Sequence, residues 1–126
     1  MPLQIKAIAF SCYAVTDFVR ARAFYEGVLG LKPTMVVGEA GSMQWAEYDI
    51  GSATLSIGSG APGWKPSPDG CSVALEVEDF DASVAQLRAH GVIFRVEPMD
   101  TGVCQMAVFS DPDGNSLILH KRKPSA

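Results

Sequence analysis

The chain has 126 residues, 48% of them hydrophobic and 19% charged, and a net charge of −4. This composition predicts one globular domain, or two very small modules sharing one core, and excludes a disordered chain. Because the charge balance is acidic, we expect neither nucleic acid nor a membrane as a partner. The one basic run, 121–123, is interpreted as a solvated tail.

No stretch is long and apolar enough to span a bilayer, and the first residues lack the pattern of a signal peptide. The three cysteines are an odd number without C-x-x-C spacing. This excludes a disulfide framework and a thiolate zinc site of usual spacing, and favours a reducing, cytoplasmic location.

The first half of the chain predicts one strand, one helix and three further strands. A β-type stretch runs from Ile5 to Val15, and Asp17 then occupies the position of a helix N-cap. The apolar spacing after Asp17 predicts a helix that ends at Gly30, since glycine accepts the left-handed cap. The three strand-like runs that follow are Thr34 to Val37, Met43 to Ile50 and Ala53 to Ile57.

The second half predicts the same order of elements. A strand from Cys71 to Val77 leads to a second N-cap, Asp79, and the helix ends at Gly91. The segment 111–115 (D-P-D-G-N) is interpreted as a hairpin turn. The three strand-like runs are Val92 to Val96, Cys104 to Phe109 and Ser116 to His120.

These two halves form an internal repeat with an offset of 62 residues. The shift superimposes identical residues: Val15 on Val77, Asp17 on Asp79, Phe18 on Phe80, Ala23 on Ala85, Asp49 on Asp111 and Leu55 on Leu117. We therefore expect an α+β fold of two βαβββ modules within one domain, 1–126. Module 1 covers about 1–58, a Gly-, Pro- and Ser-rich linker about 58–70, and module 2 about 71–126.

Two stretches resemble the vicinal oxygen chelate superfamily of glyoxalases, extradiol dioxygenases and bleomycin-resistance proteins. One is 15–17 (V-T-D) with 24–31 (F-Y-E-G-V-L-G-L), and the other is 109–115 (F-S-D-P-D-G-N). The resemblance implies a half-open eight-stranded barrel around a cavity, and commonly a homodimer. The fold serves both enzymes and binding proteins, so function must be argued from the site.

Metal enzymes of this superfamily hold a divalent ion at four inward positions, usually with His, Gln and Glu. By spacing from the motifs, these positions fall on Phe10, Ser56, Ser72 and Ile118. None offers a carboxylate or an imidazole, which a divalent site of this kind requires. We therefore expect neither a metal nor another cofactor.

The alternation of strand residues extends the expected pocket to neighbouring positions. We expect the ligand-binding residues to be Phe10, Cys12, Ser56, Ser72, Ile118, His120 and, from the linker, Trp64. His120 and Glu76 are the candidate acid–base groups, each weighed against a solvated strand-end position. Cys12 is interpreted as a small buried thiol rather than a nucleophile. Trp64 is expected either to cap a ligand or to pack against a dimer partner.

The leading hypothesis is a metal-free protein that binds a small, partly aromatic or amphipathic molecule in the barrel cavity. One alternative is a metal-independent lyase or isomerase that uses acid–base residues. Others are a divergent metal-dependent glyoxalase or dioxygenase, and a pseudoenzyme whose cavity is filled by its own side chains. The sequence does not identify the ligand.

Overall fold

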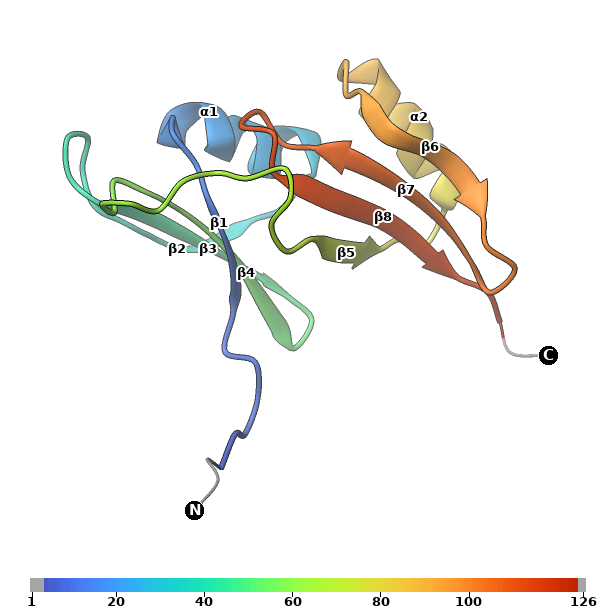
Figure 1. The fold of residues 1–126 in the computed structure, drawn as a ribbon, viewed down its shortest axis with the longest axis horizontal. Coiled ribbons are helices and arrows are strands. Elements are labelled where there is room, and N and C mark those ends of the chain that lie inside the picture. The colour runs from blue at the N-terminus through green and yellow to red at the C-terminus, as the bar shows by residue number, and fades with distance from the viewer. Residues whose placement is uncertain (1–3, 125–126) are drawn as a thin grey trace.

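The computed structural model of the chain describes residues 4–124. It contains two four-stranded sheets, with strand orders β1-β4-β3-β2 and β5-β8-β7-β6. The elements are β1 (Ser11–Ala14), α1 (Phe18–Arg22), the π-helix η1 (Ala23–Val28), β2 (Pro33–Val37), β3 (Gln44–Ile50), β4 (Ala53–Ser59), β5 (Val73–Glu76), α2 (Phe80–Ala89), β6 (Phe94–Asp100), β7 (Cys104–Ser110) and β8 (Ser116–Arg122). The α+β fold of two βαβββ modules is confirmed (Figure 1).

The 62-residue offset also holds in the register of the two parallel strand pairs. In the first sheet β1 pairs with β4 in parallel, and Cys12 lies opposite Ser56. In the second sheet β5 pairs with β8 in parallel, and Ala74 lies opposite Ile118. The second pair of residues is the first pair shifted by 62 positions. The repeat found in the sequence therefore recurs in the parallel strand pairing. The antiparallel register is shifted by one residue, since Glu47 lies opposite Ser56 but Val108, and not Phe109, lies opposite Ile118.

Both predicted N-caps are confirmed. The carboxylate of Asp17 accepts a hydrogen bond from the backbone N–H of Arg20, and that of Asp79 accepts one from Ala82, each at 3.0 Å. These bonds satisfy backbone donors that a helix start leaves free. The first helix differs from the prediction, because after Arg22 it widens into the π-helix η1.

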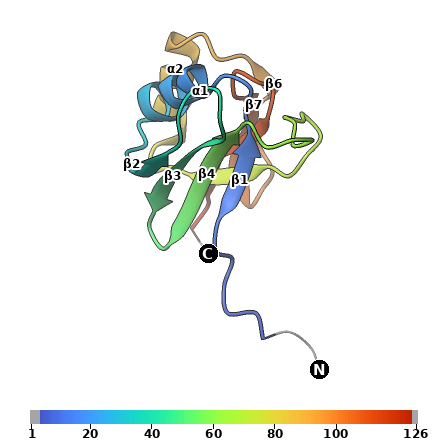
Figure 2. The same ribbon diagram turned by 90° about the vertical axis from the view of Figure 1, so that its left-hand side faces the viewer.

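The first strand is much shorter than predicted. Residues 4–10 carry no strand assignment, and Ile5 and Ile8 are 80% and 83% exposed. The segment stands away from the body of the protein (Figures 1 and 2). β1 is an edge strand of its sheet, so one side of it pairs with no other strand among residues 4–124.

The helices cover one face of the sheets and form a single core with them (Figure 1). Phe24 of η1 lies 6.4 Å from Phe109 of β7, measured between ring centroids, so module 1 packs directly on module 2. Leu55 and Ile57 of β4 and Leu117 and Leu119 of β8 contribute to this core.

Hydrogen bonds from the D-P-D-G-N turn also join the modules. The buried Asp111 carboxylate accepts a bond from the Tyr25 hydroxyl at 2.9 Å. Asn115 donates to Asp111 and to the backbone carbonyl of Ala14. The Tyr13 hydroxyl donates to the carbonyl of Ser116 and accepts from the N–H of Val73, both at 2.7 Å. The turn predicted from the sequence is thus also an inter-module clamp.

Among the described helices, none has both the length and the apolar character needed to cross a bilayer.

Candidate functional site

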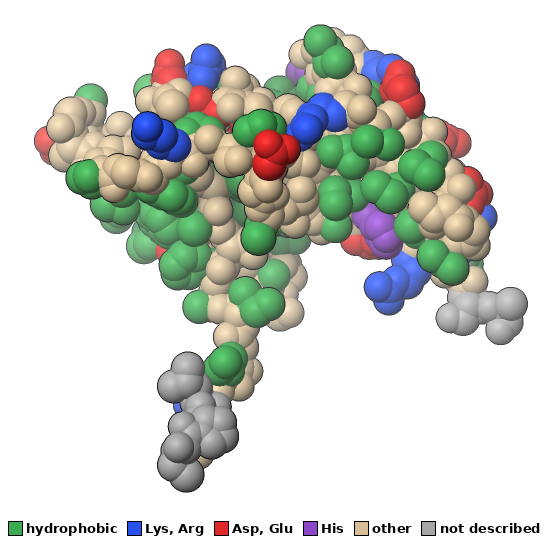
Figure 3. Space-filling model, in the orientation of Figure 1, with side chains coloured by type: hydrophobic (Ala, Val, Ile, Leu, Met, Phe, Trp, Pro, Cys, Tyr) green, Lys and Arg blue, Asp and Glu red, His purple; other side chains and the backbone are tan. Residues whose placement is uncertain are grey.

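The face of each sheet that lies opposite the helices is called the open face here. Strand residues alternate between the two faces, so Ser56 and Gly58 lie on the open face of module 1 while Ile57 enters the core. Trp45 and Glu47 of β3 lie opposite Gly58 and Ser56 in the register. Hydrophobic side chains gather beneath the module 1 sheet, left of centre in Figure 3.

Three aromatic rings form a cluster on this open face, made of Phe10, Trp45 and Trp64. The centroids of Phe10 and Trp45 are 5.4 Å apart, edge to face. Those of Trp45 and Trp64 are 6.3 Å apart at an interplanar angle of 30°. Trp64 comes from the linker, so the linker folds back onto the sheet.

Gly58 provides the space for this cluster. A Cβ atom at residue 58 would lie 2.7 Å from Cε3 of Trp45 and 2.8 Å from Cζ3 of Trp64. Both distances are shorter than carbon–carbon contact, so both indoles lie against the bare backbone of Gly58. Strand alternation in the sequence predicted that Gly58 faces the cavity, but not that two indoles lie against it.

A carboxylate and a buried hydroxyl adjoin the aromatic cluster. The indole N–H of Trp45 donates to Oε2 of Glu47 at 2.9 Å. Ser56, the register partner of Glu47 on β4, is fully buried, and its Oγ has no hydrogen-bond partner among the described residues. Tyr48, the next residue on β3, points into the core instead, where its hydroxyl donates to Glu26.

The open face of module 2 carries the two candidate acid–base residues. Nδ1 of His120 lies 2.5 Å from Oε1 of Glu76, and Oε2 of Glu76 accepts from the backbone N–H of Arg122 at 2.8 Å. The Arg122 N–H, followed by His120, lowers the pKa of Glu76. The Glu76 side chain is 54% exposed, which matches the solvated strand-end alternative better than a buried base.

The structure divides the expected pocket residues between the two sheets. Module 1 and the linker hold Phe10, Cys12, Ser56 and Trp64, and module 2 holds Ser72, Ile118 and His120. The interpretation of Cys12 as a buried thiol is wrong, because Cys12 is exposed on the open face. Neighbouring atoms still shield the thiol in part and raise its pKa, which weakens it as a nucleophile.

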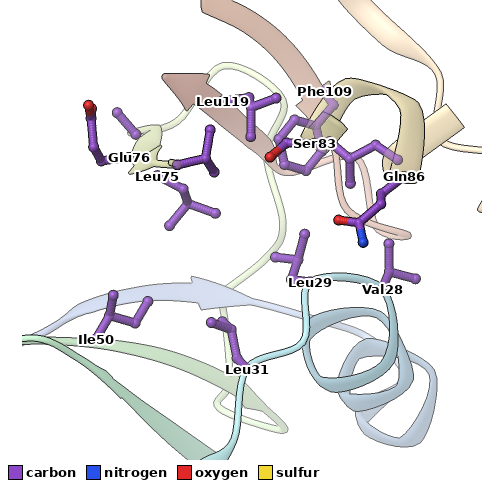
Figure 4. Close-up of a pocket in the computed structure, with 13 residues that line it drawn as sticks. Val28, Leu29, Leu31, Ile50, Leu75, Glu76, Ser83, Gln86, Phe109 and Leu119 are labelled. Atoms are coloured by element: carbon purple, nitrogen blue, oxygen red, sulfur yellow. The ribbon is translucent and has the colours of Figure 1, made fainter. Parts of the chain in front are cut away.

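A concavity lies between the modules on the helix side (Figure 4). It has a volume of about 470 Å³, and its walls are mainly aliphatic, with Leu29 and Leu31 facing Leu75. The polar Gln86 and Ser83 side chains of α2 adjoin it. This cleft was not predicted from the sequence. Its walls come from segments far apart in the chain, and no sequence motif indicates that they lie close together.

Phe10, Ser56, Ser72 and Ile118 are the residues that motif spacing predicts at the four metal-ligand positions. A phenyl ring, two hydroxyls and an aliphatic chain do not match the donors that divalent ions select. Within residues 4–124, no three His, Cys, Asp or Glu side chains are grouped closely enough to hold a metal ion.

Known proteins resemble this chain over nearly its full length. The uncharacterized protein YaeR of Escherichia coli K12 is 30% identical, and the match covers 95% of this chain and 99% of YaeR. A superfamily member from Sphaerobacter thermophilus has a TM-score of 0.75 at 26% identity, with 95% of this chain and 100% of that chain covered.

A third relative is TnmS3 of Streptomyces sp. CB03234, whose crystal structure is described as that of an antibiotic-binding protein. It has a TM-score of 0.79 at 24% identity, and the match covers 97% of this chain and 100% of TnmS3. The family model for glyoxalase, bleomycin-resistance protein and dioxygenase matches residues 4–119. The chain therefore belongs to the glyoxalase/bleomycin resistance protein/dioxygenase superfamily.

Proposed function

We propose that this protein binds a small aromatic organic molecule on the open face of module 1, without a metal ion. The observation that carries the proposal is the aromatic cluster: Trp45 and Trp64 lie against Gly58, and Phe10 lies beside them with 45% of its surface exposed. Aromatic side chains that are only partly covered offer a stacking surface to a planar ligand. The antibiotic-binding description of TnmS3 agrees with such a role.

The binding cavity is completed by a second copy of the chain. Exposed apolar side chains occur on or beside both sheets, including Met35, Val37, Val96 and Met99, each at least 40% exposed. Isolated proteins seldom leave so much apolar sheet surface and the edge strands of two sheets uncovered. A two-fold homodimer would place module 2 of one copy over module 1 of the other, and so unite the two groups of pocket residues.

Quenching of tryptophan fluorescence by the neutral planar probe 9-anthracenemethanol tests the binding function. Both tryptophans of the chain belong to the aromatic cluster, so we expect saturable quenching. The variant Trp64→Ala should weaken binding at least tenfold, whereas Val103→Ala, at an exposed position outside the cluster, should not. Absence of saturable quenching, or a requirement for one equivalent of metal, would contradict the proposal.

The composite cavity has its own test in Ser72→Leu. Ser72 is exposed in the single chain, so the larger side chain should leave folding intact. Loss of probe binding in a variant that remains dimeric by sedimentation would support a cavity shared between copies. Unchanged binding, or a monomeric wild-type protein at micromolar concentration, would restrict the site to one chain.

The contact between His120 and Glu76 favours one alternative, a metal-independent lyase or isomerase that uses this pair for proton transfer. Such an enzyme would lose turnover in both His120→Gln and Glu76→Gln while retaining affinity for the aromatic molecule. Equal activity of both variants with the wild type would remove this alternative.

A further inference from the structure

The charged residues on the strands of module 1 are all of one sign. The four strands of module 1 contain no Lys, Arg or His, whereas β3 carries Glu47 and Asp49. Residues two apart on a strand share a face, so both carboxylates lie on the open face with Trp45. The nearest cation in the sequence is Lys65, an exposed linker residue that follows Trp64.

A hydrogen bond from Trp45, and not an ion pair, holds the Glu47 carboxylate beside the aromatic cluster. One carboxylate oxygen accepts from the indole N–H of Trp45. Among residues 4–124, no ion pair is formed by Glu47, although Arg20, Arg22, Arg88, His120 and Lys123 all pair with other carboxylates. A partly covered carboxylate beside three aromatic rings, without a cation of its own, is a site for an external cation.

The buried Ser56 hydroxyl is a second observation at the same place. Buried polar atoms are nearly always hydrogen-bonded, and an unmade bond costs about 1–3 kcal/mol. Ser56 lies between Cys12 and Glu47 in the strand register, on the open face. A donor group of a bound molecule would give this hydroxyl the partner that the chain itself does not provide.

From these features we infer that the molecule bound here is a cationic planar aromatic compound, such as an aryl amine or amidine protonated at neutral pH. This inference rests on the proposed binding function and names its ligand class. The ring system stacks on Trp45 and Trp64, and the protonated nitrogen pairs with Glu47. The rings and the carboxylate act together, because the negative faces of indole rings also attract cations.

Three tricyclic probes of similar size separate charge from stacking: cationic 9-aminoacridine, neutral 9-anthracenemethanol and anionic anthracene-9-carboxylate. Titration calorimetry should give an affinity for the cation at least tenfold above that for the neutral probe, with the anion weakest. The cation's advantage should fall as salt is raised, because the carboxylate remains partly open to solvent.

Two variants locate the effect. Glu47→Gln keeps an acceptor for the Trp45 N–H but removes the charge. The affinity for the cationic probe should therefore fall to that for the neutral probe, and the affinity for the neutral probe should stay unchanged. Trp45→Phe removes the bond that orients Glu47 and should reduce the preference for the cation. Glu39→Gln is the matched control, since Glu39 lies in the exposed turn between β2 and β3.

The outcomes separate the inference from the function on which it rests. If all three probes bind equally and Glu47→Gln changes nothing, the ligand class is wrong while aromatic binding stands. If none binds, the proposed function itself fails. If Glu47→Gln weakens the dimer in sedimentation and leaves the preference among probes intact, Glu47 pairs with a cation of the partner subunit and the inference is overturned.

Discussion

Module 1 and module 2 have the same strand order and the same register in their parallel strand pairs, yet their open faces differ in chemistry. Module 1 offers indole rings and carboxylates with no strand cation, whereas module 2 offers His120 beside Glu76, with Arg122 at the end of the same strand. Gly58, which gives room to two tryptophans, has His120 as its counterpart at the offset of 62. The helix-covered faces hold the fold together, so the open faces were free to specialise.

The largest expected difference in stability between the modules is between Asp111 and Asp49, the aspartate 62 positions before it in the sequence. Asp111 is buried and accepts bonds from Tyr25, Asn115 and the N–H of Asp113, whereas Asp49 is exposed and accepts one bond from Thr54. Asp111→Ala leaves several buried donors unpaired, so we expect it to lower the free energy of unfolding by about 3 kcal/mol.

The matched variant Asp49→Ala should change stability by less than about 0.5 kcal/mol, as is usual for exposed positions. Urea denaturation monitored by circular dichroism measures both. If Asp111→Ala fails to fold, Asp111→Asn keeps an acceptor oxygen and gives an intermediate value. Equal effects at the two aspartates would show that the modules are joined by packing alone.

Gly58→Ala tests the specialised face of module 1. The backbone of Gly58 has no positive φ, so alanine causes no backbone strain, but its Cβ must displace both indole rings. We expect a loss of 9-anthracenemethanol affinity of tenfold or more and a destabilisation of roughly 1–2 kcal/mol, as in an overpacked site.

Gly27→Ala is the control for this substitution, because a Cβ there meets no atom within 4 Å. Tryptophan emission of Gly58→Ala should shift while that of Gly27→Ala stays at the wild-type value. Unchanged emission and affinity in Gly58→Ala would mean that the rings do not lie on the residue 58 backbone.

Substitution of two tyrosines compares hydrogen bonds between the modules, made by Tyr13, with a hydrogen bond within module 1, made by Tyr48. Tyr13→Phe removes a hydroxyl that serves two backbone groups of module 2 and should cost about 1–2 kcal/mol. Tyr48→Phe removes a bond to Glu26, which also pairs with Arg22 and is partly open to water, and should cost about 0.5 kcal/mol. Chemical denaturation of both variants decides the order, and a reversed order contradicts the inter-module clamp.

The smallest expected effect is a pH dependence at Glu76. Its pKa is lowered in the folded protein by the N–H of Arg122 and by His120, so the ionised form stabilises the fold above the unfolded pKa. This contribution disappears as the pH falls through the folded pKa. The change in urea midpoint between pH 7 and pH 3 should therefore be slightly smaller in Glu76→Gln than in the wild type or in Glu78→Gln.

Features that depend on local sequence were well predicted. The offset of 62 anticipated the register of the two parallel strand pairs, and Asp17 and Asp79 marked both helix starts, since an N-cap acts within one helical turn. The widening of the first helix into a π-helix was not predicted, because no residue type in 23–28 requires it.

The site was predicted only in part. Alternation placed Cys12, Ser56 and Ile118 on open faces, but it gave no reason to connect Trp45 with Glu47 or either with Gly58. Those contacts depend on the length of an indole side chain across two paired strands and on the place where the linker packs back onto the sheet, and neither follows from local sequence. Whether the seven pocket residues share one cavity remains a prediction that the dimer experiments test.

The clamp at the D-P-D-G-N turn has a consequence for the ancestry of the chain. Tyr13 and Tyr25 donate hydroxyls from module 1, and their counterparts at the offset of 62 are Leu75 and Leu87, which have none to give. A protein made of two copies of module 2 would therefore lack these hydroxyls, and one made of two copies of module 1 would lack Asn115, whose counterpart Ala53 has no side-chain amide. After duplication the halves became complementary rather than interchangeable, so a tandem copy of either module should not reproduce the joint between them.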